Sequence, residues 1–151
     1  MKATDLLKQQ HKEVMDLFEE VEDAEDPESR RQLMEQIVGE IKVHSKIEEE
    51  FFYPAVRGLG TQKAEEMVLE ALEEHHVVDL VIADLPKVDP EDERFVAKMT
   101  VFHELVEHHA KEEEEEMFKS ARRLGKEELE ALGERMEARA EELKSKARRA
   151  A

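Results

Sequence analysis

The sequence predicts an all-α protein: an up-down-up-down four-helix bundle with an additional C-terminal amphipathic helix. Glu, Leu, Ala, Lys and Arg are abundant, whereas the 151 residues include only 5 glycines and 4 prolines, a composition typical of helices. Those few helix breakers divide the chain into segments of helical length. Within the segments, apolar residues recur at alternating steps of three and four, the core-facing pattern of a left-handed bundle. We expect the bundle to span residues 1–123 and the extension residues 124–151.

The first two helices are expected on either side of Pro27. The first runs from about Thr4, a residue type suited to the N-cap, to the stretch DAEDP that ends at Pro27. The second begins near Pro27, because proline is favoured in a first helical turn, and it ends by Pro54 or shortly after, before RGLGT. Neither segment shows a strand pattern.

The third and fourth helices follow similarly short connections, which favour antiparallel neighbours. The third extends from about Thr61 to Pro86, and the fourth runs from KVDP to roughly Arg123, with Gly125 as its stop. Residues 126–149 carry leucine, methionine and alanine on one stripe, which predicts a fifth, amphipathic helix. This helix packs either on its own bundle or on a partner chain, so a monomer and a homodimer both fit.

Histidine interrupts the core-facing stripe of every bundle helix, and in two helices a glutamate follows one turn later. Alternating helix directions bring these groups to matching depth, so we expect them to converge. An ionised carboxylate in a core is unfavourable unless it is paired or bound to a metal. The six groups are His11, His44, Glu48, His75, His109 and Glu113.

The two histidine–glutamate pairs indicate a metal centre. HSKIE at 44–48 and HAKEE at 109–113 lie 65 residues apart, and residues four apart on a helix point the same way. Neutral imidazole and carboxylate suit iron, manganese or zinc. For two metal ions, four histidines, two bridging carboxylates and one bridging oxygen fill roughly ten of twelve positions, which leaves about two for dioxygen, peroxide or water.

At these positions the sequence resembles the hemerythrin-like, or HHE cation-binding, family. His11, HSKIE, EEHHVV and HHAKEEEEEMF follow that family's order of H, HxxxE, H, HxxxE over about residues 1–123. Ferritin-like di-iron bundles use Glu-x-x-His instead. The resemblance implies a centre of two non-haem iron ions. Members of the family bind or sense dioxygen, handle peroxide or nitric oxide, or deliver iron for repair.

Two residues bear on how such a centre would work. Oxygen-carrying hemerythrins have five histidines with HxxxH in the third helix, whereas His75 is followed four residues later by Asp79. The missing nitrogen favours a more open, reactive site over reversible oxygen carriage. Tyr53, the only tyrosine, lies five residues beyond Glu48 and just before Pro54. It is either a packing residue at the helix end or a phenolate ligand of ferric iron.

Neighbouring histidines leave a choice of ligand in two helices. A strict 65-residue repeat would pair His11 with His76. However, His75 continues the apolar stripe of its helix, so we expect His75 to face the centre. The same reasoning selects His109 over His108. We expect the remaining histidines at the surface or beside the ligands, where a carboxylate could orient a ligand imidazole. They are His76, His103 and His108.

Composition excludes several classes of partner. Forty acidic and 23 basic residues give a net charge of −17, which repels nucleic acid and anionic lipid and favours cationic ligands. Apart from Glu113, the glutamate run 112–116 is expected to be a solvated face. The chain has no apolar run of about 18 residues and no leader, so we expect a cytoplasmic protein without a membrane span. The absence of cysteine excludes disulfides and thiolate metal sites.

The pattern therefore favours a di-iron protein that binds or turns over dioxygen or peroxide, with catalase-like or peroxidase-like protection as its activity. The alternative is oxygen, nitric oxide or iron sensing, or iron storage, at the same centre without catalysis. A purely structural helical protein would require the six buried groups to pair with one another without a metal.

Overall fold

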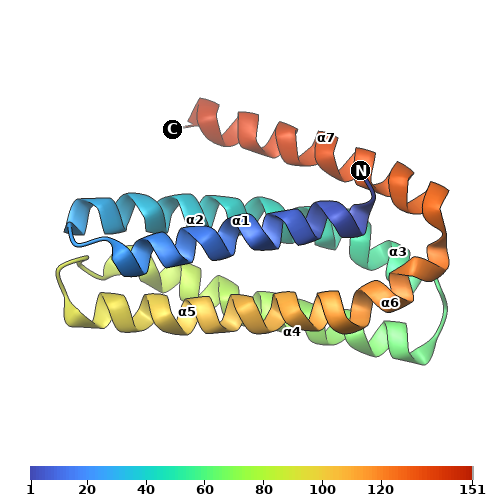
Figure 1. The fold of residues 1–151 in the computed structure, drawn as a ribbon, viewed down its shortest axis with the longest axis horizontal. Coiled ribbons are helices and arrows are strands. Elements are labelled where there is room, and N and C mark those ends of the chain that lie inside the picture. The colour runs from blue at the N-terminus through green and yellow to red at the C-terminus, as the bar shows by residue number, and fades with distance from the viewer. Residues whose placement is uncertain (151) are drawn as a thin grey trace.

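The structure, a computed structural model, describes residues 1–150 and consists of helices joined by short loops. Four long helices run alongside one another in alternating directions, and a fifth crosses over one side of this bundle (Figure 1). The predicted fold class is confirmed. The long helices are α1 (Ala3–Asp23), α2 (Pro27–Ile47), α4 (Gln62–Asp84), α5 (Glu93–Glu112) and α7 (Lys126–Ala150).

Shorter helical elements extend three of the bundle helices. α2 continues through the π-helix η1 (Glu48–Phe52) into α3 (Tyr53–Arg57), and α4 ends in the 3₁₀ turn η2 (Leu85–Lys87). α5 continues through the π-helix η3 (Glu113–Met117) into α6 (Phe118–Ala121) and the 3₁₀ turn η4 (Arg122–Leu124).

Within residues 1–150, none of the helices is both long and apolar enough to cross a membrane.

Local chemistry explains several of the helix ends. Asp26, Thr61 and Asp92 precede α2, α4 and α5, and each accepts a hydrogen bond from a backbone N–H of the first turn, at 3.1, 3.1 and 2.9 Å. Gly125 separates η4 from α7 with φ of 90°, a conformation that glycine adopts readily. The predicted stop at this glycine is confirmed.

The expectation that Thr4 caps α1 is wrong. α1 begins one residue earlier, at Ala3, and its N-cap Lys2 makes no side-chain cap hydrogen bond. Packing positions this first turn instead, because Ala3 is fully buried and its backbone lies against Gly133 of α7. A tertiary contact thus takes the place of a local cap.

Buried apolar side chains form two clusters. One, which includes Leu7 and Val68, is covered by residues of α7. The other lies toward the opposite end of the bundle and includes Phe18 and Phe102. Burying one such side chain stabilises the fold by roughly 1.5–3 kcal/mol. The two clusters therefore hold the bundle together on either side of a layer of buried polar groups.

The π segments place unusual turns next to this polar layer. Each begins at a buried glutamate, and the backbone N–H of the fifth following residue bonds to that glutamate's carbonyl, in one case Tyr53 to Glu48 and in the other Phe118 to Glu113. The wider turn brings side chains five apart, rather than four, onto one face. Pro54, which has no N–H to donate, favours the first π segment. Nothing comparable in the sequence explains the second.

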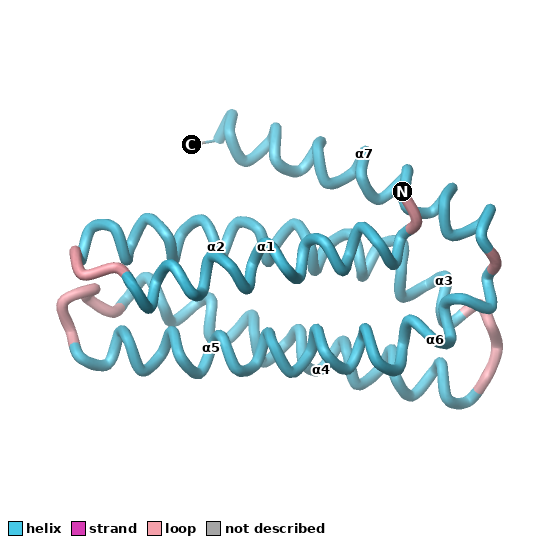
Figure 2. The backbone as a smooth tube through the Cα atoms, in the orientation of Figure 1, coloured by secondary structure: helices cyan, strands magenta, loops and turns pink. Residues whose placement is uncertain are grey.

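Helix α7 packs on its own chain. It lies over α1 and α2 and passes the N-terminus (Figure 2). Its buried stripe includes Leu132 and Met136, and at its edge the Arg139 guanidinium Nε lies 2.9 Å from Glu50 Oε2. In the structure this helix covers its own bundle, and the alternative of packing on a partner chain stays a prediction.

The crossing of α7 over the N-terminus predicts opposite effects for two glycine substitutions. A Cβ at Gly133 would lie 2.8 Å from the Ala3 nitrogen and closer still to the Met1 carbonyl oxygen, whereas a Cβ at Gly39, in the exposed middle of α2, would meet nothing within 4 Å. We expect Gly133→Ala to lower the free energy of unfolding by about 1–3 kcal/mol. Gly39→Ala should raise it by about 0.5–1 kcal/mol. Urea denaturation of both variants measures this, and an unchanged midpoint for Gly133→Ala would contradict the packing described.

Candidate metal centre

Six buried polar side chains converge in the layer between the two apolar clusters. Each bundle helix supplies one imidazole, and each π segment begins with one carboxylate. These are the six residues predicted from the sequence, and none is more than 9% exposed. They are His11 on α1, His44 on α2, His75 on α4, His109 on α5, Glu48 on η1 and Glu113 on η3.

The donor atoms of these side chains form two adjacent groups, within each of which all atoms lie within 4.8 Å of one another. Both carboxylates belong to both groups. Two anionic groups shared between two clusters of imidazoles can bridge a pair of metal cations. We call the groups position A, formed by His11, His44, Glu48 and Glu113, and position B, formed by His75, His109, Glu48 and Glu113.

The inward atoms of position A lack hydrogen bonds. His11 Nε2 lies 3.2 Å from Glu113 Oε1, and His44 Nε2 lies 3.3 Å from Glu48 Oε2. Although these distances suit ion pairs, none of the four atoms has a hydrogen-bond partner within residues 1–150. A buried polar atom left unpaired costs about 1–3 kcal/mol. Four nitrogen and oxygen atoms that face one another in this way fit a cation, which would satisfy all of them at once.

Position B contains a third type of group, the Tyr53 hydroxyl. His75 Nε2 lies 3.1 Å from Glu48 Oε1, and His109 Nε2 lies 2.9 Å from Glu113 Oε2. The Tyr53 hydroxyl lies 3.1 and 3.2 Å from these two nitrogens and donates a hydrogen bond to Glu113 Oε2 at 2.5 Å. The π turn that follows Glu48 is what brings this side chain to the centre.

Each imidazole is held from behind by one further polar side chain. A partner on Nδ1 turns Nε2 toward the centre and sets the basicity of the ring. The four Nδ1 contacts are His11 with Glu114 Oε2 at 3.0 Å, His44 with Gln10 Oε1 at 2.6 Å, His75 with Glu49 Oε2 at 3.1 Å and His109 with Glu74 Oε1 at 2.8 Å.

These four partners were not predicted from the sequence, and Glu114 was expected on a solvated face. Each partner sits on a different helix from the imidazole it contacts, so spacing along one helix does not reveal it. The positions of these partners along the sequence give a weaker signal. Gln10 and Glu74 directly precede a core-facing histidine, and Glu49 and Glu114 directly follow a core-facing glutamate.

Burial and carboxylate contacts act in opposite directions on the imidazole pKa values. Burial lowers the pKa of His11, but the Glu113 carboxylate 3.2 Å from its Nε2, together with Glu114 on its Nδ1, outweighs burial and raises the value to about 9. The pKa of His75 is raised in the same way, chiefly by Glu48, and that of His109 is raised well above its usual range, chiefly by Glu113. Burial raises the pKa of Glu48, but the surrounding imidazoles hold it well below its usual range. With no cation bound, protons on His11, His75 and His109 therefore face the ionised carboxylate of Glu48.

A small apolar cavity adjoins the inner side of the centre. Its volume is about 30 Å³, and its lining includes all four inward imidazoles. The aliphatic residues Val14, Ile41, Val78 and Val106 complete much of the wall. Because one water needs about 10–15 Å³, this space holds roughly two or three heavy atoms.

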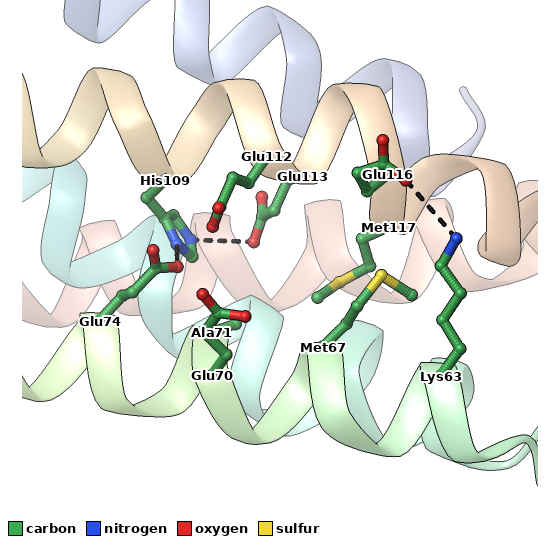
Figure 3. A pocket seen from close by; sticks show the side chains of 10 residues that line it. All are labelled: Lys63, Met67, Glu70, Ala71, Glu74, His109, Glu112, Glu113, Glu116 and Met117. Carbon is green, nitrogen blue, oxygen red and sulfur yellow. Dashed lines mark hydrogen bonds and ion pairs between the residues drawn. The ribbon is translucent and has the colours of Figure 1, made fainter.

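A larger acidic cavity reaches the centre from outside, between α4 and α5. Its volume is about 150 Å³, and it touches His109 and Glu113 at its inner end. Figure 3 shows the carboxylates of Glu70, Glu74 and Glu112 directed into the space between the two helices. This lining favours cations over anions.

The remaining histidines lie away from positions A and B. His76 is exposed, as is Asp79, which stands where a fifth histidine would occur. The His108 side chain is 66% exposed. His103 stacks on Phe18, with ring centroids 4.7 Å apart, beside the far apolar cluster. Of each neighbouring pair, the structure thus brings His75 and His109 into the centre.

The raised pKa values predict that metal binding releases protons. His11 is largely protonated near pH 7 without metal, and an imidazole binds metal only when it is neutral. As pH falls from about 9, more protons must be displaced, so the apparent affinity for a divalent cation should fall. Calorimetric titration with Mn²⁺ at pH 7 in two buffers of different ionisation enthalpy measures the release. Identical heats in both buffers would contradict it.

Comparisons with known proteins agree with this geometry. The profile of the hemerythrin HHE cation binding domain matches residues 2–121. The uncharacterized protein Rv2633c of Mycobacterium tuberculosis strain H37Rv is 29% identical over 147 residues, which cover 95% of this chain and 88% of that protein. A DNA nickase of Nostoc sp. strain PCC 7120 is 26% identical over 123 residues, 81% of this chain but 34% of the nickase.

A solved structure shows the same fold. The crystal structure of a hemerythrin HHE cation binding domain-containing protein, the Rv2633c homolog from Mycobacterium kansasii, superposes with a TM-score of 0.85 at 27% identity. The match covers 97% of this chain and 90% of that one. The chain belongs to the hemerythrin HHE cation-binding domain family.

Proposed function

We propose that this protein holds two non-haem iron ions and uses them to bind or turn over dioxygen or peroxide. The imidazoles of positions A and B would be terminal ligands, and Glu48 and Glu113 would bridge the two ions. The observation that carries this proposal is the set of four buried, unpaired donor atoms at position A beside two carboxylates shared with position B.

The donor set supports iron without excluding manganese or zinc. Nitrogen and carboxylate oxygen suit all three metals, and no cysteine is present to favour a softer ion. Dioxygen and peroxide chemistry needs a metal that changes oxidation state, which iron and manganese do and zinc does not. The hemerythrin family favours iron of these two. When bound, the pair of ions would supply and accept the two electrons that separate peroxide from water or from dioxygen.

The surrounding residues would select a small, uncharged reactant. The inner cavity of about 30 Å³ admits molecules of the size of dioxygen, nitric oxide or hydrogen peroxide. Its walls between the imidazoles are aliphatic, from residues such as Val14 and Val106. Aliphatic walls of this kind favour a small, uncharged molecule over an ion, because burying an unpaired charge is costly.

Tyr53 would contribute a proton or a ligand atom. Burial, followed by the charges of Glu48 and Glu113, raises the pKa of Tyr53 well above its usual range. Its hydroxyl therefore holds a proton in the absence of metal and donates it to Glu113 Oε2. From the same place the hydroxyl could deliver that proton to a reactant, or lose it and act as a phenolate ligand.

Iron loading and peroxide turnover test the proposed function. We expect about two iron ions per chain after anaerobic loading with ferrous iron, and dioxygen release from hydrogen peroxide over many cycles. Glu113→Ala should bind fewer than about one ion per chain and lose turnover, because a shared bridge is removed. Glu115→Ala, an exposed neighbour on the same π segment, is the matched control and should behave as wild type.

The same iron-loading and peroxide experiment separates catalysis from sensing or storage. Two bound ions that react once with peroxide and then stop would favour sensing or storage over catalysis. A wild-type protein without bound metal, whose stability is unaffected by chelator, would contradict the proposal.

Tyr53→Phe distinguishes the two roles of the hydroxyl. If Tyr53 binds ferric iron as phenolate, the loaded wild-type protein should show a visible charge-transfer band that the variant lacks. If it serves only as a proton donor, the spectrum should be unchanged while peroxide turnover falls by about 10²–10⁴-fold. A variant that keeps both the spectrum and the turnover rate would assign Tyr53 to packing alone.

A further inference from the structure

The centre is built from two similar halves. Each half consists of a helix pair, α1–α2 or α4–α5, and contributes one imidazole from its first helix and one imidazole and one carboxylate from its second. The offset between equivalent residues is 64 or 65 positions. The equivalent pairs are His11 with His75, His44 with His109, and Glu48 with Glu113.

The outer contacts repeat in the first imidazole pair. His11 Nδ1 lies 3.0 Å from Glu114 Oε2, and His75 Nδ1 lies 3.1 Å from Glu49 Oε2. Both partners are carboxylates that directly follow a shared glutamate in the sequence. At this pair, positions A and B are chemically matched.

The second imidazole pair breaks the repeat. His44, in position A, has its Nδ1 2.6 Å from the amide oxygen of Gln10. His109, in position B, has its Nδ1 2.8 Å from the carboxylate of Glu74. Gln10 and Glu74 occupy equivalent places, each one residue before the first histidine of its half. The halves therefore differ by one full negative charge at a direct contact.

In the described part of the chain, no permanently charged cation offsets the Glu74 carboxylate. Within residues 1–150, no lysine or arginine lies within 4.0 Å of the Glu74 carboxylate, whose ion-pair contacts are to His109 and His108. Glu70 and Glu112 line the same cavity and add to the negative potential (Figure 3). Gln10, by contrast, is neutral.

We propose that Glu74 and Gln10 are positioning residues that make the two metal positions unequal, so that position B binds its ion more tightly and fills before position A. A carboxylate that accepts the Nδ1 proton makes the imidazole a stronger donor and adds negative charge close to the cation, and a carboxamide does less of both. The inference rests on the proposed pair of metal ions, but it does not depend on the reaction they perform.

Anaerobic calorimetric titration with ferrous iron tests the order of filling. The wild-type protein should show two binding steps. Glu74→Gln should weaken the tighter step by about 10–100-fold, and Gln10→Glu should strengthen the weaker one by a similar factor. The double exchange, Gln10→Glu with Glu74→Gln, should restore two separated steps. A gain in affinity at position A cannot arise from structural damage.

Glu70→Gln is the matched control, because it removes a charge from the same cavity while the side chain has no contact with Glu74 or with an imidazole of position B. It should leave the ratio of the two affinities within about 3-fold of wild type, since a group without direct contact acts only through screened charge. A Glu70→Gln effect as large as that of Glu74→Gln would overturn the role of the direct contact.

Mössbauer spectra after addition of one equivalent of ⁵⁷Fe²⁺ provide a readout of site identity. Wild type should show one quadrupole doublet, and Glu74→Gln should add a second, because position B loses the contact that makes it fill first. Two ions bound with equal affinity in wild type, or a ratio unchanged by Glu74→Gln, would overturn this inference while leaving the proposed function intact. Binding of fewer than two ions would refute both.

Discussion

The central constraint on this structure is the burial of two carboxylates, Glu48 and Glu113, in the middle of a helical bundle. An ionised group in such a place is tolerable only with compensating positive charge and hydrogen bonds. Four imidazoles surround the pair, and the raised pKa values of His11, His75 and His109 keep protons on these three rings when no metal is bound. Bound cations would supply the same compensation with greater charge. The metal centre and the proton arrangement of the metal-free protein are thus two solutions to one electrostatic problem.

The rest of the fold keeps that polar layer in place. Two apolar clusters, one on each side of it, contain the buried apolar side chains that stabilise the bundle. Helix α7 covers the apolar cluster that includes Leu7 and Val68. Its close approach to the first turn of α1 holds the N-terminal end of the helix that carries His11. The outer partners on Nδ1 then orient each ring. Rigid placement of this kind lets a site exchange protons for cations without rearranging.

The two helix pairs are nearly symmetrical, and the few differences between them make positions A and B chemically unequal. The two helix pairs supply matching imidazoles and carboxylates, yet position B alone has a carboxylate behind its second imidazole and a phenol in front of it. At the equivalent of Tyr53, position A has Phe118, whose ring lies parallel to His11 at 6.4 Å and offers no polar atom. The acidic cavity also opens toward position B, through His109. Together these differences give a symmetrical scaffold two chemically distinct ends.

The sequence by itself determined the bundle and the six converging residues, because helical periodicity reports which side chains of one helix face the core. The apolar stripe was therefore enough to select His75 over His76 as the core-facing residue, and the spacing of four was enough to pair His44 with Glu48. Only the tertiary structure decided what crosses between helices. Side chains from different helices meet in the contacts of Gln10, Glu49, Glu74 and Glu114. The π turns replace a step of four residues by a step of five. The first turn of α1 is positioned by its packing on α7 and not by a Thr4 cap. None of these follows from periodicity, since each depends on how neighbouring helices meet.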